Sequence, residues 1–240
     1  MLTPRIVVVA DGLKGRSLDG DARFAWRTKP SSPVGLGTIA DAVPWGCRTD
    51  RITMFHGPQG YLGVAPLADG RADLAAAVSP GWLESNRSGA PLPAFAGSFG
   101  VELDDHCGGS RTLGTPHLTR SRNRVEADGR IFLCGDSTGY LEPFTGEGMS
   151  WALVSAERIL PHLLGALDGN YLLGSWSRDL AADLRARHGL CRGVSALLAR
   201  PRLTRAFVGL CGRIPPAAML ASDLIGRAQN RNARPATVVA

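Results

Sequence analysis

Two short apolar runs mark the strands on which the chemistry of this chain is expected to depend. The first run, Ile6–Val9, leads into Ala10-Asp11-Gly12, and the second, Ile131–Cys134, leads into Gly135-Asp136. Apolar runs of this length, without polar alternation, are typical of strands buried on both faces. Both runs therefore predict a buried strand with an acidic residue and a glycine just beyond its carboxyl end.

The segment between about residues 33 and 78 has the pattern of an antiparallel sheet. Three stretches typical of strands, at 51–55, 61–65 and 72–78, are separated by the sequences HGPQG and ADGR. Glycine, proline and aspartate at these spacings favour tight connections between neighbouring strands. We expect a meander of strands in this part of the chain.

Helical periodicity begins after the second apolar run. A helix is predicted from about residue 147 to residue 164, because apolar residues recur there at spacings of three and four. These residues are Met149, Ala152, Leu153, Ala156, Ile159, Leu160 and Leu163. From 171 to 227 the pattern predicts two or three further helices, broken near Pro201 and Pro215-Pro216.

The order of these elements favours an α/β fold, α+β overall. Two strands that end in Asp and Gly, the second followed by a loop and a helix, suit a nucleotide-binding core. We expect segments 1–30 and 110–165 to form that core and 31–109 to be an inserted antiparallel sheet. Residues 166–240 are expected to form a helical C-terminal region.

Charge is distributed unevenly along the 240 residues. Residues 1–150 hold 15 basic and 16 acidic residues, whereas 151–240 hold 12 and 5. A basic C-terminal third is compatible with an anionic lipid surface or an anionic substrate. Because it lacks interleaved aromatic residues and known nucleic-acid motifs, we expect no nucleic-acid partner. Lacking a long apolar stretch and a signal-peptide core, the chain is expected to be cytoplasmic, with peripheral membrane contact left open.

No metal centre or catalytic side chain is predicted. The five cysteines are scattered without the spacing of zinc ligands or of a disulfide framework. The five histidines show no motif spacing, and no Ser-His-Asp arrangement is assigned. The catalytic residues are therefore unknown at this stage.

The densest chemical signal is the segment 135–153. Gly135 allows a close approach to the backbone, and Asp136 at a strand end is suited to accept hydrogen bonds from sugar or polyol hydroxyls. Gly146 and Gly148 expose backbone N–H groups where the helix begins, and Glu147 lies between them. The positive end of the helix dipole would stabilise an anionic or electron-rich group there.

Two segments resemble motifs of the two-dinucleotide-type FAD oxidoreductases. VVVADGLKGRS at 7–17 resembles their DG motif, and RIFLCGDSTGYLEPFTGEGM at 130–149 resembles their second FAD fingerprint. Within that superfamily, PFTGEGM at 143–149 is similar to the geranylgeranyl reductase branch. The stretch 57–78 and the tail around Trp176 are also similar to that branch. The resemblance implies a partial FAD-binding core, an inserted antiparallel substrate sheet and a helical C-terminus.

The resemblance also implies which residues hold the FAD. Pro143 and Thr145 would lie against the flavin ring, near the helix start that faces its N1/C2 edge. The full set of expected FAD-binding residues is Asp11, Gly12, Gly135, Asp136, Pro143, Thr145, Gly146, Glu147, Gly148 and Met149.

One family feature is not found in the sequence. The family opens with a GxGxxG turn for the ADP half of FAD, followed by an acidic residue, and neither occurs here. The resemblance implies that about a hundred or more residues of the family pattern would precede the DG motif. The sequence is expected to be a fragment, to have a misassigned start, or to be half of a split protein.

The predicted function is that of an FAD-dependent oxidoreductase acting on an apolar, prenyl or lipid-like substrate, with NAD(P)H or a reduced carrier as reductant. Double-bond reduction by hydride transfer through the flavin is the first hypothesis. Hydroxylation of an aromatic or polyketide-lipid substrate is the second, although Gly139 stands where the hydroxylase branch often has His. A catalytically incomplete chain is the third. Four aromatic residues are candidates for an apolar substrate pocket: Trp45, Tyr61, Phe132 and Trp151.

Overall fold

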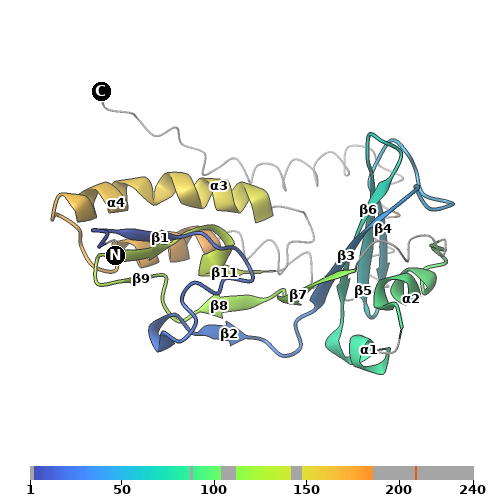
Figure 1. Cartoon of the computed structure of the whole chain (residues 1–240), viewed down its shortest axis with the longest axis horizontal. Coiled ribbons are helices and arrows are strands. Elements are labelled where there is room, and N and C mark those ends of the chain that lie inside the picture. The colour runs from blue at the N-terminus through green and yellow to red at the C-terminus, as the bar shows by residue number, and fades with distance from the viewer. Residues whose placement is uncertain (1–2, 87–88, 104–111, 142–147, 186–208, 210–240) are drawn as a thin grey trace. The chain divides into compact units, whose positions relative to one another are not determined.

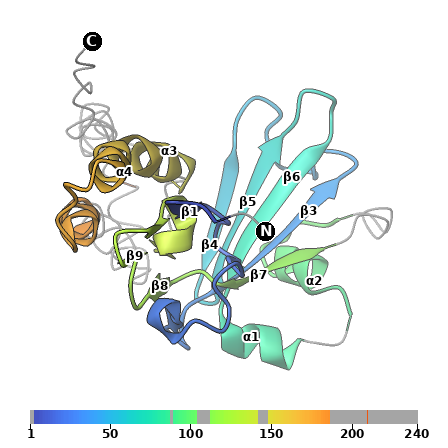
Figure 2. The same ribbon diagram turned by 60° about the vertical axis from the view of Figure 1, so that its left-hand side comes forward.

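The chain divides into two units, each of which has its own sheet (Figures 1 and 2). Unit 1 comprises residues 1–26 and 122–240, and unit 2 comprises 27–121. The structure, a computed structural model, describes residues 3–86, 89–103, 112–141, 148–185 and 209. The chain thus crosses between the units at residues 26–27 and 121–122. The predicted insertion, 31–109, is shorter than unit 2 at both ends.

Unit 2 is built on a five-stranded antiparallel sheet. Its strand order is β4-β5-β6-β3-β7, so β3, the first of these strands in the chain, lies between β6 and β7. The strands are β3 (Val34–Ala40), β4 (Thr53–Gly57), β5 (Gly60–Pro66), β6 (Ala72–Val78) and β7 (Leu113–His117). The three consecutive strands β4, β5 and β6 form the predicted meander.

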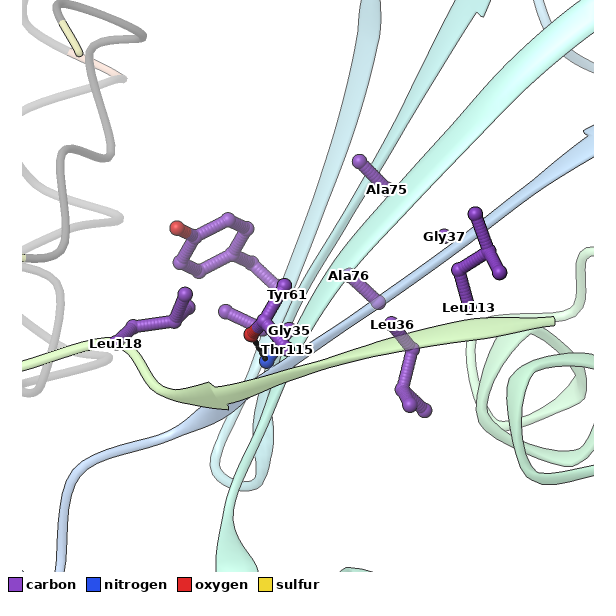
Figure 3. A pocket seen from close by; sticks show the side chains of 10 residues that line it. Gly35, Leu36, Gly37, Tyr61, Ala75, Ala76, Leu113, Thr115 and Leu118 are labelled. Carbon is purple, nitrogen blue, oxygen red and sulfur yellow. Dashed lines mark hydrogen bonds between the residues drawn. The ribbon is translucent and has the colours of Figure 1, made fainter. Parts of the chain in front are cut away.

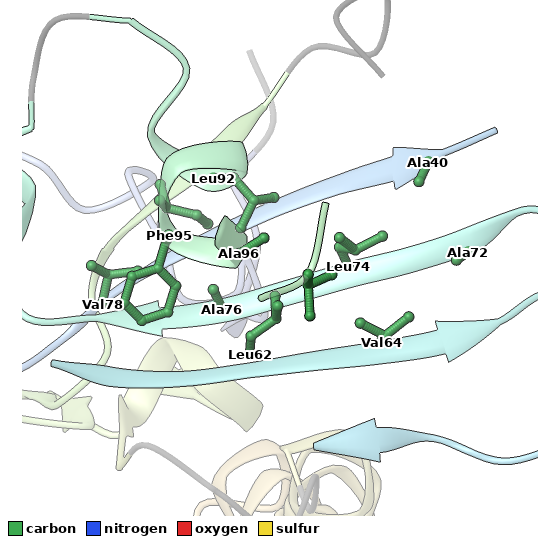
Figure 4. Packing of buried hydrophobic residues seen from close by; sticks show 12 residues of the cluster. Ala40, Leu62, Val64, Ala72, Leu74, Ala76, Val78, Leu92, Phe95 and Ala96 are labelled. Carbon is green, nitrogen blue, oxygen red and sulfur yellow. The ribbon is translucent and has the colours of Figure 1, made fainter. Parts of the chain in front are cut away.

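One face of this sheet carries the core of unit 2. Alternation along β6 turns Leu74, Ala76 and Val78 to the same face, where all three are buried. Two short helices, α1 (Pro80–Ser85) and α2 (Pro91–Gly97), follow β6. Figure 4 shows Leu92, Phe95 and Ala96 of α2 directed at this face, within one buried cluster.

The β4–β5 hairpin depends on one glycine. Gly57 and Gly60 are register partners on either side of a two-residue turn. Gly60 has φ +139°, and a Cβ atom there would lie 1.9 Å from the carbonyl oxygen of Ala77. Only glycine therefore fits between the turn and the adjacent strand. The predicted HGPQG turn is confirmed.

Unit 1 contains a three-stranded sheet of order β1-β10-β9. β1 (Val7–Val9) pairs in parallel with β10 (Ile131–Leu133), and β9 (Glu126–Ala127) pairs antiparallel with β10. Phe132 and Leu133 are fully buried, as predicted for the second apolar run. The mixed class with an inserted antiparallel sheet is confirmed.

The first apolar run is less buried than predicted. Val9 is buried, but Val7 and Val8 are 39% and 44% exposed. The reason is topological, since β1 lies at the edge of its sheet among the described residues and β10 lies at the centre. The sequence pattern of a central parallel strand therefore occurs here on an edge strand.

Further short elements connect the sheets and helices of the fold. A second three-stranded sheet has the order β11-β8-β2. Its strands are β2 (Trp26–Thr28), β8 (Arg120–Arg122) and β11 (Gly139–Tyr140). Two short 3-10 helices, η1 (Ala22–Phe24) and η3 (Gly135–Thr138), complete the set.

The predicted helix 147–164 is two helices. α3 (Gly148–Arg158) is followed by α4 (Leu160–Leu167), and Pro161 lies in the first turn of α4. Proline lacks the N–H that would continue the α3 hydrogen-bond pattern, which explains the interruption. A further helical stretch is described over 175–185, and the predicted breaks near Pro201 and Pro215-Pro216 lie outside the described residues. No helix in the described ranges is long and apolar enough to span a membrane.

Candidate functional site

The two Asp/Gly motifs lie at the same edge of one sheet. In the parallel β1–β10 pair, Val7 is opposite Ile131 and Val9 is opposite Leu133. Asp11-Gly12 and Gly135-Asp136 therefore follow neighbouring strands at their common carboxyl end. Ligands of open α/β sheets bind at this edge, because the loops there diverge and leave a crevice.

The turn after β1 is organised by the carboxylate of Asp11. Its Oδ2 accepts a hydrogen bond of 2.8 Å from the backbone N–H of Ser17, and the N–H of Gly15 donates to the carbonyl of Gly12 at 3.1 Å. Oδ1 is buried and has no hydrogen-bond partner among the described residues. Burial alone would raise the pKa of Asp11. The hydrogen bonds from Ser17 and the charge of Arg122 together outweigh burial, so the pKa lies below its ordinary value. The turn thus holds an ionised carboxylate with one unused acceptor.

Gly15 leaves the space beside that acceptor. A Cβ at Gly15 would lie 2.6 Å from Asp11 Oδ1, 2.9 Å from Arg122 Nη2 and 3.0 Å from the carbonyl oxygen of Gly12. Any side chain would displace at least one of these groups. Gly12 differs, because it has φ +74° and nothing within 4 Å of an added Cβ, so its role is conformational.

The turn after β10 is fixed to α3. Gly135 has φ +61°, and its N–H donates to Ser155 Oγ at 2.7 Å. A Cβ on Gly135 would lie 3.3 Å from the Cβ of Ala152, so the close approach at this glycine is that of helix α3. The buried hydroxyl of Ser137 lies 2.7 Å from the carbonyl oxygen of Cys134 and 2.8 Å from that of Val9, and its proton ties the two strand ends together.

Asp136 presents a half-buried carboxylate at this turn. In the described part of the chain its carboxylate has no hydrogen-bond partner, and burial raises its pKa. Its backbone carbonyl accepts from the N–H of Gly139 and closes the short η3 helix. A carboxyl group desolvated without a partner is suited to bind hydroxyl groups of a ligand.

Arg122 connects the two turns and was not predicted from the sequence. It is 7% exposed, and its guanidinium donates to the carbonyl oxygens of Phe24 at 2.7 Å, Gly15 at 2.9 Å and Ser137 at 3.3 Å. The guanidinium carbon lies 3.8 Å from the centroid of the Trp26 ring. Arg122 ends the short strand β8, and its partners come from distant segments, so the local sequence pattern did not single it out.

The start of α3 contains the last of the predicted site residues. A Cβ on Gly148 would lie 3.4 Å from the ring of Tyr140, and Met149 is 80% exposed. Neither residue contacts Asp11 or Asp136 through a described interaction. Pro143, Thr145, Gly146 and Glu147 lie outside the described residues.

Unit 2 contains a separate pocket of about 310 Å³ on the sheet face opposite its core. Its floor consists of small residues, because the register pairs Gly35 with Ala77 and Gly37 with Ala75. Figure 3 shows Tyr61 and Leu118 on one side of this floor and Leu113 on the other. The floor is flat and apolar as a result of this pairing.

Few polar groups reach this pocket. Thr115 Oγ1 accepts from the N–H of Gly35 at 2.9 Å and donates to the carbonyl oxygen of Pro116 at 2.8 Å. Of the four aromatic residues considered from the sequence, Tyr61 lines this pocket. Phe132 is fully buried in the core of unit 1, Trp45 is 95% exposed, and Trp151 lines only a small crevice beside Trp176.

The described residues hold no cluster of acidic, histidine or cysteine side chains that would bind a metal ion. Cys134 is buried and Cys47 is partly buried, and both are free thiols.

Three solved structures illustrate the fold to which the chain is similar. The chondrochloren halogenase CndH of a myxobacterium, an FAD-dependent halogenase variant, is 15% identical, with TM-score 0.61 over 80% of this chain and 46% of that one. A flavoprotein/dehydrogenase of Cytophaga hutchinsonii is 20% identical, with TM-score 0.54 over 73% and 45%. PqsL of Pseudomonas aeruginosa, a probable FAD-dependent monooxygenase, is 26% identical, with TM-score 0.52 over 81% and 55%.

These similarities establish the fold of FAD-dependent halogenases, monooxygenases and flavoprotein dehydrogenases. The chain spans about half the length of each of the three proteins. No protein-family model matches the sequence. No curated protein matches it either.

Proposed function

We propose that this chain forms part of an FAD-dependent oxidoreductase and that the carboxyl ends of β1 and β10 contribute to its FAD site. The observation that carries the proposal is the parallel register of these strands, which brings the Asp11 and Asp136 turns to one edge. The fold shared with FAD-dependent halogenases and monooxygenases supports the same cofactor.

The chemistry of the two turns fits a flavin dinucleotide. Asp11 Oδ1 is a buried acceptor without a partner in the described chain, and Asp136 is a desolvated carboxyl group. Both groups are suited to accept hydrogen bonds from the hydroxyl-rich ribityl segment of FAD. When bound, the flavin would supply the redox chemistry, and the residues of this chain would bind it and orient it.

We further propose that the substrate is apolar and binds in the unit 2 pocket. The small-residue floor accepts a flat molecule, and the apolar side chains Leu113 and Leu118 remove its surface from water. Burial of apolar surface contributes about 25 cal/mol per Å², so hydrocarbon contact would supply most of the affinity. An aromatic ring system and a prenyl chain both satisfy this description.

Two reaction types are candidates for this site. Oxygenation of an aromatic substrate is favoured by the likeness to PqsL, whose structure was solved with 2-aminobenzoylacetate. Reduction of a prenyl double bond is favoured by the sequence PFTGEGM at 143–149. NAD(P)H or a reduced carrier would supply the electrons in either case.

FAD binding and product analysis test the proposal in two stages. The protein is first titrated with FAD, and saturable binding of one FAD per chain is expected. The reduced complex is then offered a prenyl lipid without oxygen, and an aromatic acid with oxygen. A gain of two hydrogens per lipid double bond supports reduction, and incorporation of oxygen into the aromatic ring supports oxygenation. Absence of saturable FAD binding contradicts the cofactor assignment for this chain.

A further inference from the structure

Arg122 occupies an unusual position for a buried arginine. Its three described hydrogen bonds all go to backbone carbonyl oxygens, and they reach three separate segments of unit 1. Gly15 belongs to the turn after β1, Ser137 belongs to the turn after β10, and Phe24 ends η1. One side chain therefore joins both strand-end turns to the helical segment between them.

The burial of this charge has a cost that the surroundings offset. A guanidinium removed from water needs hydrogen-bond acceptors for its N–H groups, and backbone carbonyl oxygens are the acceptors here. The Trp26 ring, 3.8 Å from the guanidinium carbon, adds a cation–π contact on one face. The nearby charge of Asp11 compensates the positive charge, although burial still lowers the pKa of Arg122.

We propose that Arg122 is a positioning residue for the FAD site, an inference that rests on the proposed function. By holding the carbonyls of Gly15 and Ser137, it fixes the distance between the Asp11 turn and the Asp136 turn. The two carboxyl groups then face a ligand in one arrangement, without any contact between Arg122 and the ligand.

Lysine is unable to replace arginine in this role. The three carbonyls lie around a planar group with five donors in a fixed fork, whereas an ammonium group has three donors at one point. Arg122→Lys therefore keeps the positive charge near Asp11 and loses the simultaneous hold on the three segments. This substitution separates the charge of Arg122 from its geometry.

Arg130 offers a matched control in the same unit. It also donates to backbone carbonyls, those of Pro4 at 2.9 Å and Arg5 at 3.3 Å, but it is exposed and lies at the opposite end of β10. Arg130→Lys changes the same chemical group away from the two turns. Its effect on FAD binding is expected to be negligible.

The test measures FAD affinity and amide hydrogen exchange in the wild type, Arg122→Lys and Arg130→Lys. Since hydrogen bonds to charged groups are among the stronger ones, Arg122→Lys is expected to weaken FAD binding about tenfold or more. In the ligand-free protein it should accelerate exchange at the Ser17 amide, which Asp11 protects, and leave the amide of Leu133 in the strand unchanged.

Two results would overturn the inference. The first is that Arg122→Lys binds FAD as tightly as the wild type. The second is that amide exchange at Ser17 and at Leu133 accelerates by the same factor in Arg122→Lys, which would indicate general destabilisation. If the wild type binds no FAD, the proposed function fails. The exchange data from ligand-free protein then still decide whether Arg122 orders the two turns.

Discussion

Val9 on β1 and Leu133 on β10 are register partners in a parallel strand pair. Asp11 follows Val9 by two residues, and Asp136 follows Leu133 by three. More than a hundred residues of sequence separate the two motifs, and the pairing of these strands places both at one sheet edge. Because of this pairing, two dipeptides that are common in proteins lie together and form a candidate cofactor site.

Replacement of Asp136 by alanine is expected to weaken FAD binding. Loss of a hydrogen bond from a ribityl hydroxyl to a carboxylate costs about 1–3 kcal/mol, which corresponds to roughly a 5- to 150-fold rise in Kd. Asp69→Ala is the control, since Asp69 is paired with Arg71 on the surface of unit 2. Equal Kd values for Asp136→Ala and the wild type would exclude a role for this carboxyl group.

Filling the floor of the unit 2 pocket is expected to reduce substrate binding without loss of the fold. Gly37 has no positive φ, and an added Cβ would meet only the carbonyl oxygen of Leu74 at 3.5 Å. Gly37→Val therefore places methyl groups in the pocket at little conformational cost, in a strand that favours β-branched residues.

Gly114→Val is the matched control for this pocket variant. Gly114 is an exposed residue of β7 and an added Cβ would have ordinary contact only with Leu36. Titration with an apolar fluorescent probe should give weaker binding for Gly37→Val than for Gly114→Val. Equal binding by the two variants would show that the pocket is not the apolar site.

Gly60 is expected to be essential for folding of unit 2. A Cβ there would lie 1.9 Å from the carbonyl oxygen of Ala77, and the residue has φ +139°. Gly60→Ala should therefore destabilise the fold by more than about 4 kcal/mol. Gly70→Ala has a positive φ of +88° but open space around the Cβ, and about 1–2 kcal/mol is expected. Thermal unfolding followed by circular dichroism distinguishes the two, and similar losses would contradict the clash.

The stability of unit 1 is expected to fall in acid through Glu126. This buried carboxylate accepts hydrogen bonds from the hydroxyl of Tyr171 and from the N–H of Ser177. Burial raises the pKa of Glu126, and these hydrogen bonds outweigh it, so the pKa lies below its ordinary value of 4.5. A lowered pKa stabilises the fold above the unfolded-state pKa, and that contribution is lost as the pH falls through the folded-state value.

Glu126→Gln tests this dependence. At pH 7 the variant should be about 1–3 kcal/mol less stable than the wild type, because the ionised acceptor is lost. The difference should shrink below about pH 4.5. Urea unfolding from pH 7 to pH 3 measures it, and a difference that stays constant over this range would contradict the assignment to Glu126.

The sequence predicted those features that depend on local patterns. The meander follows from the strand-like stretches and the turn residues between them, and the buried β10 follows from Ile131–Cys134. Features that depend on distant partners were missed. The exposure of Val8 depends on β1 being an edge strand. The helix break at Pro161 is different, because it is a local signal that the regular apolar spacing on both sides of the proline obscured.

The same distinction applies to the candidate site. Asp11 and Asp136 were predicted because each follows a recognisable strand, and the register of the strands brings them together. Arg122 was missed because its three carbonyl partners come from separate segments, which no local pattern reveals. The small floor of the unit 2 pocket was missed because it depends on which glycines face which alanines across β3 and β6.

The central claim is that the carboxyl ends of β1 and β10 bind FAD. The most direct test is an FAD titration followed by the backbone amide NMR signals of the wild-type protein. The account predicts saturable changes at one FAD per chain, centred on residues 12–17 and 135–138, with small changes at the buried strand β6 of unit 2. Absence of saturation, or changes confined to unit 2, would contradict it.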